Sequence, residues 1–175
     1  MFEKRLNESA ARHLTRRINP LHSGVGPMVE MTGRQILLLA SNDYLGLAMH
    51  PEVIQASVEA TQRFGAGAGA ARLISGSLPP HQDLESALAQ FKGTEAALTF
   101  SSGYLANIGT IPALIEQGGL ILADRLCHAS LIDGCRLSAA DFRVYRHNDI
   151  GHLQSLLAKR RRARHTLIVT DGLFS

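Results

Sequence analysis

The chain has 175 residues, of which 45% are hydrophobic and 19% charged, a composition that suits one globular domain with a core. It contains no run of about 18 apolar residues, and its charged start lacks the apolar centre of a signal peptide, so we expect a cytoplasmic protein without a membrane span. The formal net charge is +3, with a basic cluster at residues 159–164 that fits a solvated helix end better than a nucleic-acid surface.

The sequence of the first half of the chain predicts helices joined by irregular segments. The predicted elements are, in chain order, a helix (3–17), a loop (21–33), a strand (34–40) and two helices (52–64 and 80–91). Pro51 suits the first position of the middle helix. Glycine at every second position over residues 65–69 resists regular structure, so residues 65–77 are either a flexible linker or a loop whose backbone approaches a ligand.

Strands and helices alternate in the second half. The predicted strands are 95–100, 120–124, 142–145 and 166–171, and the predicted helices are 104–116, 129–137 and 150–160. Continuous apolar strands separated by helices predict an α/β fold with a mostly parallel sheet sandwiched by helices. Cys127 and Cys135 are expected to be buried thiols rather than a disulfide or a metal pair, and no metal site is predicted.

Polar residues gather where three of the predicted strands end, at residues 101–104, 124–128 and 171–175. Parallel sheets bind ligands beyond the carboxyl ends of their strands, so we expect a site there. After the first strand a helix begins, whose free N–H groups suit a phosphate, and Gly103 lets the phosphate approach the backbone. The alternative is a simple N-cap by Ser101 or Ser102. The segment is neither a P-loop nor a dinucleotide motif.

The remaining polar residues each allow a functional and an ordinary interpretation. Tyr104 can lie near a flat heterocycle or be a half-buried tyrosine. His128 can stack on a ring, hold a substrate or transfer a proton, or it can cap a helix. Asn148 and Asp149 precede a predicted helix, and capping explains both. Asp171 ends the last predicted strand, where the alternative is a loop.

Six segments occur in an order and spacing typical of one family. They are "SNDYLGL…HPEVI", "GAGAARLISGSLPPHQDLE", "FSSGYLAN", "ADRLCHASLIDG", "RHND" and "VTDGLFS". Together they resemble the α-oxoamine synthases, which are fold-type I enzymes that use pyridoxal 5′-phosphate (PLP). The resemblance covers nearly the whole chain. It implies an N-terminal helix and strand segment over residues 1–40, and an incomplete PLP-binding large domain of the fold-type I transferases over residues 41–175.

The resemblance implies roles for five residues near the cofactor. Gly103 and Tyr104 match the pair whose backbone holds the PLP phosphate. His128 matches the catalytic histidine that stacks on the pyridine ring and helps orient the substrate. Ser175 matches the serine near the phenolic oxygen of PLP, and Asp171 stands where the family has an acidic residue close to the cofactor.

Substrate contacts are implied for Arg16, Asn42 and His128. The implied reaction is a decarboxylating condensation of L-alanine with pimeloyl-CoA or pimeloyl-ACP, in biotin biosynthesis, by a cytoplasmic homodimer that involves no nucleic acid and no membrane. "SSGYLAN" favours this reaction over that of glycine C-acetyltransferase, which usually carries a Cys-Phe pair at this place. A sister synthase that uses glycine and a non-catalytic binding protein of the same fold are the alternatives.

A PLP enzyme of this kind needs a lysine that forms a Schiff base. The chain has only Lys4, Lys92 and Lys159, and each is predicted in a helix or at its end rather than at the end of a strand. The family pattern also continues beyond "VTDGLFS". We therefore interpret the chain as the N-terminal part of a longer protein, a fragment that has the phosphate site but lacks the catalytic lysine and is inactive alone.

Overall fold

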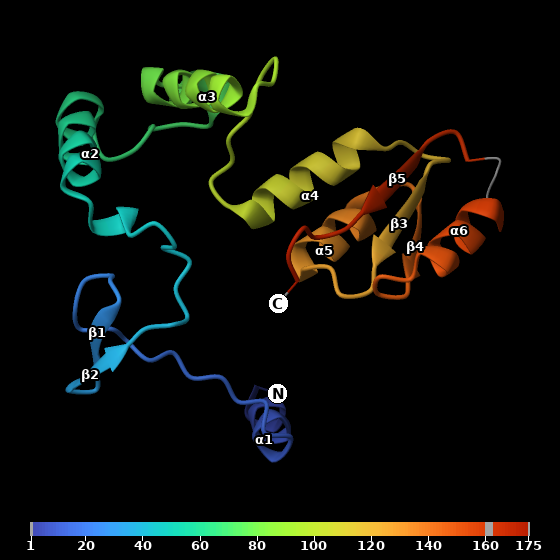
Figure 1. Ribbon diagram of the computed structural model, residues 1–175, viewed down its shortest axis with the longest axis horizontal. Helices are drawn as coiled ribbons and strands as arrows, with labels where there is room; N and C mark the ends of the chain where they lie inside the picture. Colours follow the sequence, from blue (N-terminus) through green and yellow to red (C-terminus); the bar gives the residue numbers. More distant parts are fainter. Residues whose placement is uncertain (1, 160–162, 175) are drawn as a thin grey trace. The chain divides into compact units, whose positions relative to one another are not determined.

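The computed structural model describes residues 2–159 and 163–174. The chain divides into two compact units, Met1–Pro80 and His81–Ser175, and each is described by itself. The regular elements of the first unit are α1 (Phe2–Ala11), β1 (Met28–Met31), β2 (Arg34–Leu37), a 3-10 turn (Leu47–Met49), α2 (Pro51–Phe64) and a π-helical turn (Arg72–Gly76), as labelled in Figure 1. The domain division expected at residue 40 stays a prediction.

The first unit contains a strand that the sequence analysis missed. β1 lies inside the predicted loop 21–33 and pairs with β2 as an antiparallel hairpin, with Val29 opposite Ile36. Thr32 and Gly33 form the two-residue turn with φ of 52° and 72°, the left-handed geometry that suits the twist of a hairpin. The predicted helix 3–17 is also too long, because α1 ends at Ala11 and His13 adopts φ 55°.

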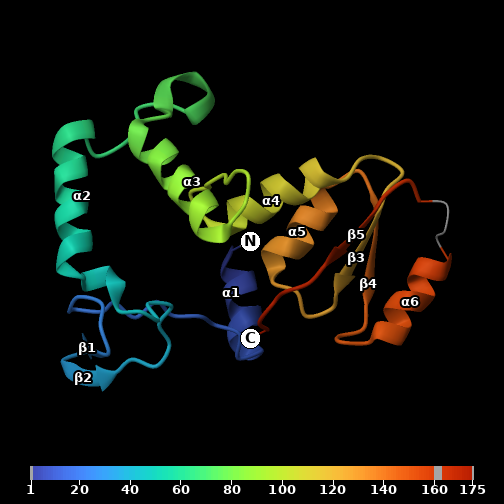
Figure 2. The same ribbon diagram turned by 45° about the horizontal axis from the view of Figure 1, so that its top comes forward.

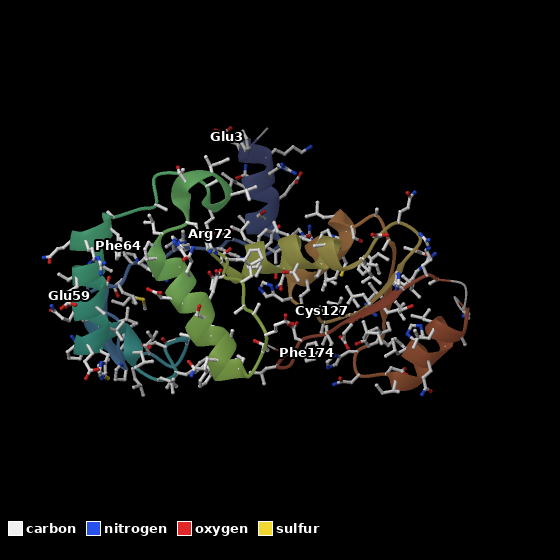
Figure 3. The ribbon with its side chains drawn as sticks, turned by 90° about the horizontal axis from the view of Figure 1, so that it is seen from above. Glu3, Glu59, Phe64, Arg72, Cys127 and Phe174 are labelled. Carbon is white, nitrogen blue, oxygen red and sulfur yellow. The ribbon has the colours of Figure 1, made fainter. Side chains whose placement is uncertain are left out.

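The helices of the first unit expose their apolar side chains. α2 begins at Pro51 as predicted, and Gly65 with φ 85° ends it. Its apolar stripe of Val53, Ile54 and Val58 remains 42–48% exposed. Figure 3 draws the side chains of this helix as sticks, with Glu59 and Phe64 labelled, and none of its residues is buried. The amphipathic pattern is therefore present in α2 without a buried face.

The second unit carries the parallel sheet that the alternating pattern predicted. The chain enters it through α3 (Pro79–Lys92), and the elements that follow are α4 (Gly103–Leu114), β3 (Leu120–Asp124), α5 (Ala129–Leu137), β4 (Asp141–Tyr145), α6 (Ile150–Lys159) and β5 (Thr166–Val169). The strand order is β4-β3-β5, and both pairings are parallel. The predicted α/β class and its helix-covered parallel sheet are thus confirmed.

The central strand β3 is buried along its whole length because helices cover both faces of the sheet. Ile121 and Ala123 point into a cluster with α4 and α5, while Leu120 and Leu122 point into a cluster with α6. This alternation follows the two-residue period of a strand. Figures 1 and 2 show α5 on one side of the three strands and α6 on the other.

The strand predicted over residues 95–100 is wrong. These residues follow α3 and form no ladder within the part of the chain that the structure describes. The Thr99 backbone N–H and hydroxyl both donate to the Glu85 carboxylate, at 2.8 and 2.9 Å. A side chain of α3 therefore takes the place that a neighbouring strand's carbonyl would fill.

The two cysteines are buried free thiols, as predicted. Cys135 lies in the cluster between α5 and the sheet, and burial raises the pKa of its thiol to about 11. Burial also raises the pKa of Cys127. Over residues 2–159 and 163–174, no helix is both long enough and apolar enough to span a bilayer.

Candidate functional site

The start of α4 offers two free backbone donors. The Ser102 hydroxyl caps the helix by accepting from the Leu105 N–H at 3.1 Å, so the N-cap considered as the alternative to a phosphate site is present. Within the described chain, the N–H groups of Gly103 and Tyr104 have no acceptor. A Cβ placed on Gly103 would meet no atom within 4 Å, so the space beside these donors is open. The cap and an anion can thus use different N–H groups of one helix end.

A buried carboxylate closes β3. Asp124 is 1% exposed and accepts hydrogen bonds from the backbone N–H groups of Leu126 (2.8 Å) and Asn148 (3.1 Å). Its Oδ1 also lies 3.0 Å from His147 Nδ1. Burial alone would raise the pKa of Asp124, but these three hydrogen bonds outweigh it and hold the pKa below its ordinary value. Asp124 thereby joins the loops that follow β3 and β4.

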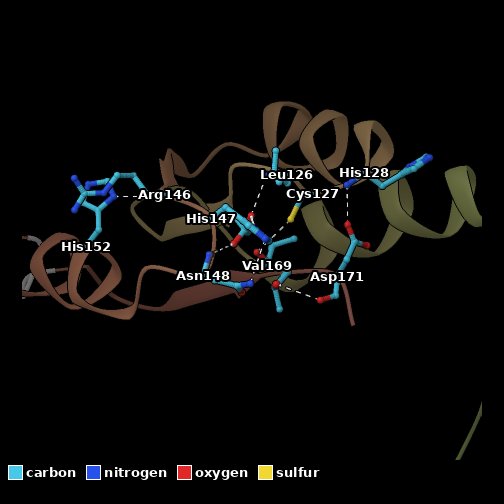
Figure 4. A network of polar contacts seen from close by, with 11 residues as sticks. Leu126, Cys127, His128, Arg146, His147, Asn148, His152, Val169 and Asp171 are labelled. Atoms are coloured by element: carbon cyan, nitrogen blue, oxygen red, sulfur yellow. Dashed lines mark hydrogen bonds and ion pairs between the residues drawn. The ribbon is translucent and has the colours of Figure 1, made fainter. Parts of the chain in front are cut away.

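His128 is the N-cap residue of α5 and follows the loop after β3. Its backbone N–H donates to Asp171 Oδ2 at 2.8 Å, and the Cys127 thiol lies 3.5 Å from the Val169 carbonyl. The parallel pairing of β3 with β5 brings these residues together, as expected for two strands whose carboxyl ends share one edge. In Figure 4 the His128 ring extends away from Asp171.

Two further polar residues, absent from the predicted site, fix the His128 ring. The Ser130 hydroxyl lies 2.7 Å from His128 Nδ1, and the Ser130 backbone N–H donates to the same atom at 3.2 Å. Asn107 on α4 donates its side-chain amide to the Ser130 hydroxyl at 2.9 Å. The spacing His-x-Ser at a helix start was the available signal for Ser130, whereas Asn107 is brought there only by the packing of α4 on α5.

Close packing of α4 on α5 also places Tyr104. Its hydroxyl donates to Asp133 Oδ2 at 3.2 Å, and this hydrogen bond, with the negative charge of Asp133, raises the pKa of the Tyr104 phenol. Gly134 permits the approach, because a Cβ there would lie 2.8 Å from the Asn107 carbonyl oxygen. Tyr104 remains 47% exposed, so its ring is accessible to a ligand.

The other predicted site residues belong to the first unit or lie outside the described residues. Arg16 and Asn42 are exposed residues of the first unit, and their roles stay predictions. Ser175 lies outside the described residues. Asp149 caps α6 by accepting from the His152 N–H at 2.7 Å, which confirms its predicted role.

None of the three lysines directly follows a strand along the chain. Lys4 is in α1, Lys92 ends α3 and Lys159 ends α6. Among the described residues, no group of three histidines, cysteines or carboxylates is arranged to hold a metal ion. The second unit therefore offers two N–H donors for an anion, an accessible phenol and an oriented imidazole.

Comparison with known proteins supplies a family for this arrangement. A sequence model described as "Aminotransferase class I and II" matches residues 34–175. The 8-amino-7-oxononanoate synthase of Geobacter sulfurreducens is 51% identical over 170 residues, which cover 97% of this chain and 44% of that protein. The synthase of the same name from Anaeromyxobacter sp. (strain K) is 52% identical over 165 residues, covering 94% of this chain and 41% of that protein. The chain thus spans less than half the length of these curated relatives.

Solved structures agree with this assignment. Sphingomonas wittichii serine palmitoyltransferase matches with a TM-score of 0.88 and 34% identity, covering 99% of this chain and 44% of that chain. A serine palmitoyltransferase from S. paucimobilis, solved with a bound PLP–myriocin aldimine, matches with a TM-score of 0.89 and 30% identity, covering 99% of this chain and 46% of that chain. Because the family's sequence model covers most of the chain, the chain belongs to the aminotransferase class I and II family.

Proposed function

We propose that this chain is the N-terminal part of a PLP-dependent acyltransferase that condenses L-alanine with a pimeloyl thioester, the reaction of an 8-amino-7-oxononanoate synthase. Identity of 51% to the Geobacter sulfurreducens synthase over nearly the whole chain supports the assignment. The observation that carries it is the pair of free N–H groups of Gly103 and Tyr104 at the capped start of α4. An α-helix start with open space beside it suits the phosphate of the cofactor.

The residues present fit this cofactor. Gly103 and Tyr104 supply hydrogen-bond donors for the phosphate, and the exposed His128 ring supplies a flat surface for a pyridine. Asp171 holds the His128 backbone through a 2.8 Å hydrogen bond. When bound, PLP supplies an electron sink for the amino-acid substrate. The Schiff-base lysine would belong to the part of the enzyme outside this chain, since Lys4, Lys92 and Lys159 all stand in helices.

The residues of this chain contribute by positioning the cofactor. The phosphate contacts at α4 hold one end of the cofactor, and His128 at the start of α5 covers its ring, so two helix starts define its orientation. Gly134 permits the close approach of the two helices, and the Tyr104–Asp133 hydrogen bond joins them. Asp171 and Ser175 beside the cofactor, and Arg16 and Asn42 toward the substrate, are the further contacts that we propose.

A pair of substitutions at one position tests the phosphate site. In the complete protein, Gly103→Asp would set a carboxylate beside the proposed phosphate, and Gly103→Asn would set a neutral side chain of the same size there. Both fit sterically, because the position is open, and an acidic residue suits the first turn of a helix. We expect PLP affinity, measured by absorbance titration, to fall about 100-fold for Gly103→Asp and only a few-fold for Gly103→Asn. Equal losses would contradict phosphate binding at this helix start.

Product analysis tests the reaction. The complete protein is supplied with L-alanine or glycine, and with pimeloyl-CoA or pimeloyl-ACP. We expect carbon dioxide and 8-amino-7-oxononanoate from L-alanine. Preference for glycine would indicate the sister synthase, and PLP binding without turnover would indicate a binding protein of the same fold. The acyl carrier follows from which thioester gives the lower KM.

The assembly and location implied by the family resemblance remain part of this proposal. Leu73 and Ile74, beside the glycine-rich segment 65–71, are 94% and 80% exposed, which fits a surface that another subunit covers. Analytical ultracentrifugation of the complete protein is expected to give a homodimer, and Leu73→Asp to weaken it. A monomer at micromolar concentration would contradict the proposed assembly. The cytoplasmic location stays a prediction from the charged N-terminal segment.

A further inference from the structure

We infer that Ser130 and Asn107 are positioning residues that hold the neutral His128 ring in the tautomer with its proton on Nε2. The ring would then present an N–H donor, rather than an unprotonated nitrogen, on the side away from α5. The tautomer is a property of this chain alone, and only its consequence for catalysis rests on the proposed function.

The first step concerns the backbone N–H of Ser130, whose hydrogen position follows from the peptide geometry. The Ser130 backbone N–H points to His128 Nδ1, with 3.2 Å between the two nitrogens. A backbone amide is always a donor, so Nδ1 must accept. A hydrogen on Nδ1 would face the amide hydrogen of Ser130 and break this contact, which is also the cap of α5.

The second step concerns the Ser130 hydroxyl, which lies 2.7 Å from His128 Nδ1. Asn107 donates its amide to the same hydroxyl oxygen at 2.9 Å. Because Nδ1 already accepts from the backbone N–H of Ser130, it carries no hydrogen, so the hydroxyl donates its hydrogen to Nδ1 while Asn107 donates to a lone pair of the oxygen. Ser130 is 1% exposed, so water has little access to this chain of hydrogen bonds.

Two donors of Ser130 thus converge on one nitrogen. In the neutral imidazole one nitrogen accepts and the other donates, so Nε2 carries the proton. This arrangement differs from a catalytic histidine whose orienting carboxylate accepts from Nδ1–H, because here the orienting groups are donors. The nearby Asp171 contacts the backbone N–H of His128 and not its ring.

The tautomer is read directly by two-bond ¹H–¹⁵N correlation spectra of the complete protein labelled with ¹⁵N-histidine, with His128→Gln used to assign the signals. We expect His128 Nδ1 to show an unprotonated nitrogen and Nε2 a protonated one, with or without PLP. In Ser130→Ala the two shifts should move toward each other, since only the weaker backbone donor remains. Ser138→Ala, at the other end of α5, is the matched control and should leave the His128 signals unchanged.

Kinetics then separate the positioning role from the proposed reaction. Loss of one buried hydrogen bond predicts a fall in kcat of about 5-fold to 10-fold for Ser130→Ala, with the KM for the amino acid nearly unchanged. Asn107→Ala should cost less, and the double variant should be no worse than Ser130→Ala, because Asn107 acts through Ser130.

A protonated Nδ1 in the unaltered protein would overturn the inference, and so would equal spectral effects of Ser130→Ala and Ser138→Ala. Additive losses of kcat in the double variant would overturn the role of Asn107. A protein that shows the expected spectrum but binds no PLP would instead overturn the proposed function and leave the tautomer assignment in place.

Discussion

Both units of the chain contain helices and strands, but they differ in how much they bury. In the second unit, β3 is buried from end to end between helices. Among the described residues of the first unit, only Val29 and Gly76 are buried. The sequence patterns that specify hairpins, turns and helices extend over only a few residues, so both units form these elements. A core also needs a second apolar surface opposite the first, which the sheet of the second unit supplies for α4, α5 and α6.

The difference matters for function because a binding site needs fixed neighbours. The four apolar residues of β3 are each at most 1% exposed, and burial of a side chain such as Leu or Ile stabilises a fold by about 1.5–3 kcal/mol. The residues that orient His128 all lie in this packed unit. Substitutions matched between the units measure how unequal the two are.

The largest difference in stability between the two units is expected when one aspartate is replaced by alanine in each of them. Asp124→Ala in the complete protein leaves the N–H groups of Leu126 and Asn148 and the His147 ring without their shared acceptor. We expect the free energy of unfolding, from urea denaturation, to fall by about 3 kcal/mol. The control is Asp43→Ala in the first unit, where one exposed bond to the Ala48 N–H is lost and about 1 kcal/mol or less is expected. Equal losses would show that the two units are equally well packed.

The second comparison between the units replaces one glycine by alanine in each of them. In Gly134→Ala the new methyl would lie 2.8 Å from the Asn107 carbonyl oxygen and 3.0 Å from the Ile111 side chain. Although alanine favours helix, the clash involves backbone, so we expect a net loss of about 1–2 kcal/mol. Gly67→Ala in the first unit meets no atom within 4 Å and should change stability by about 0.5 kcal/mol or less. Thermal unfolding of both variants measures the difference, and a neutral Gly134→Ala would disprove close packing of α4 on α5.

A smaller effect is expected on the way in which the stability of the second unit depends on pH. The folded pKa of Asp124 is depressed, so its contribution to stability is complete above the unfolded pKa, near 4, and is lost as pH falls through the lower folded pKa. Asp149 shifts in the same direction, chiefly through the His152 N–H. Denaturation at pH 6 down to pH 2 should therefore show a smaller acid loss in Asp124→Asn than in the unaltered protein. Parallel curves would mean that Asp124 contributes nothing to the pH dependence.

The smallest effect concerns Tyr104, which is half exposed. Its hydrogen bond to Asp133 and the charge of that residue raise the phenol pKa, so Tyr104 should ionise later than a free tyrosine in ultraviolet titration. Asp133→Asn should bring the pKa back toward its ordinary value, and Tyr104→Phe identifies the signal. An unchanged titration in Asp133→Asn would mean that the contact is absent in solution.

The sequence predicted the site better at its centre than around it. The cap at Ser102, the open Gly103 and the histidine after β3 follow from short-range signals, because helix starts and strand ends are encoded over a few residues. Asn107 and Gly134 were missed, because nothing near them in the sequence indicates that α4 will pack on α5. Asp124 was noted only as a polar residue at a strand end, and its three hydrogen-bond donors come from two loops.

The errors in the predicted secondary structure also arise because contacts with distant residues cannot be read from local sequence. Residues 95–100 have the apolar character of a strand, but a strand exists only where a partner accepts its hydrogen bonds, and Thr99 is bonded to Glu85 instead. β1 was missed because its own four residues are ambiguous, and the left-handed turn at Thr32 and Gly33 pairs it with β2.

The sequence by itself determined the α/β alternation, most of the helices and the motifs at the strand ends, since these depend on periodicity and on turn chemistry over a few residues. Only the tertiary structure decided which strands pair, which polar groups share a hydrogen-bond network and that Asn107 contacts Ser130. Those features depend on contacts between residues that are distant along the chain, and such contacts form only when helices and sheet pack against each other.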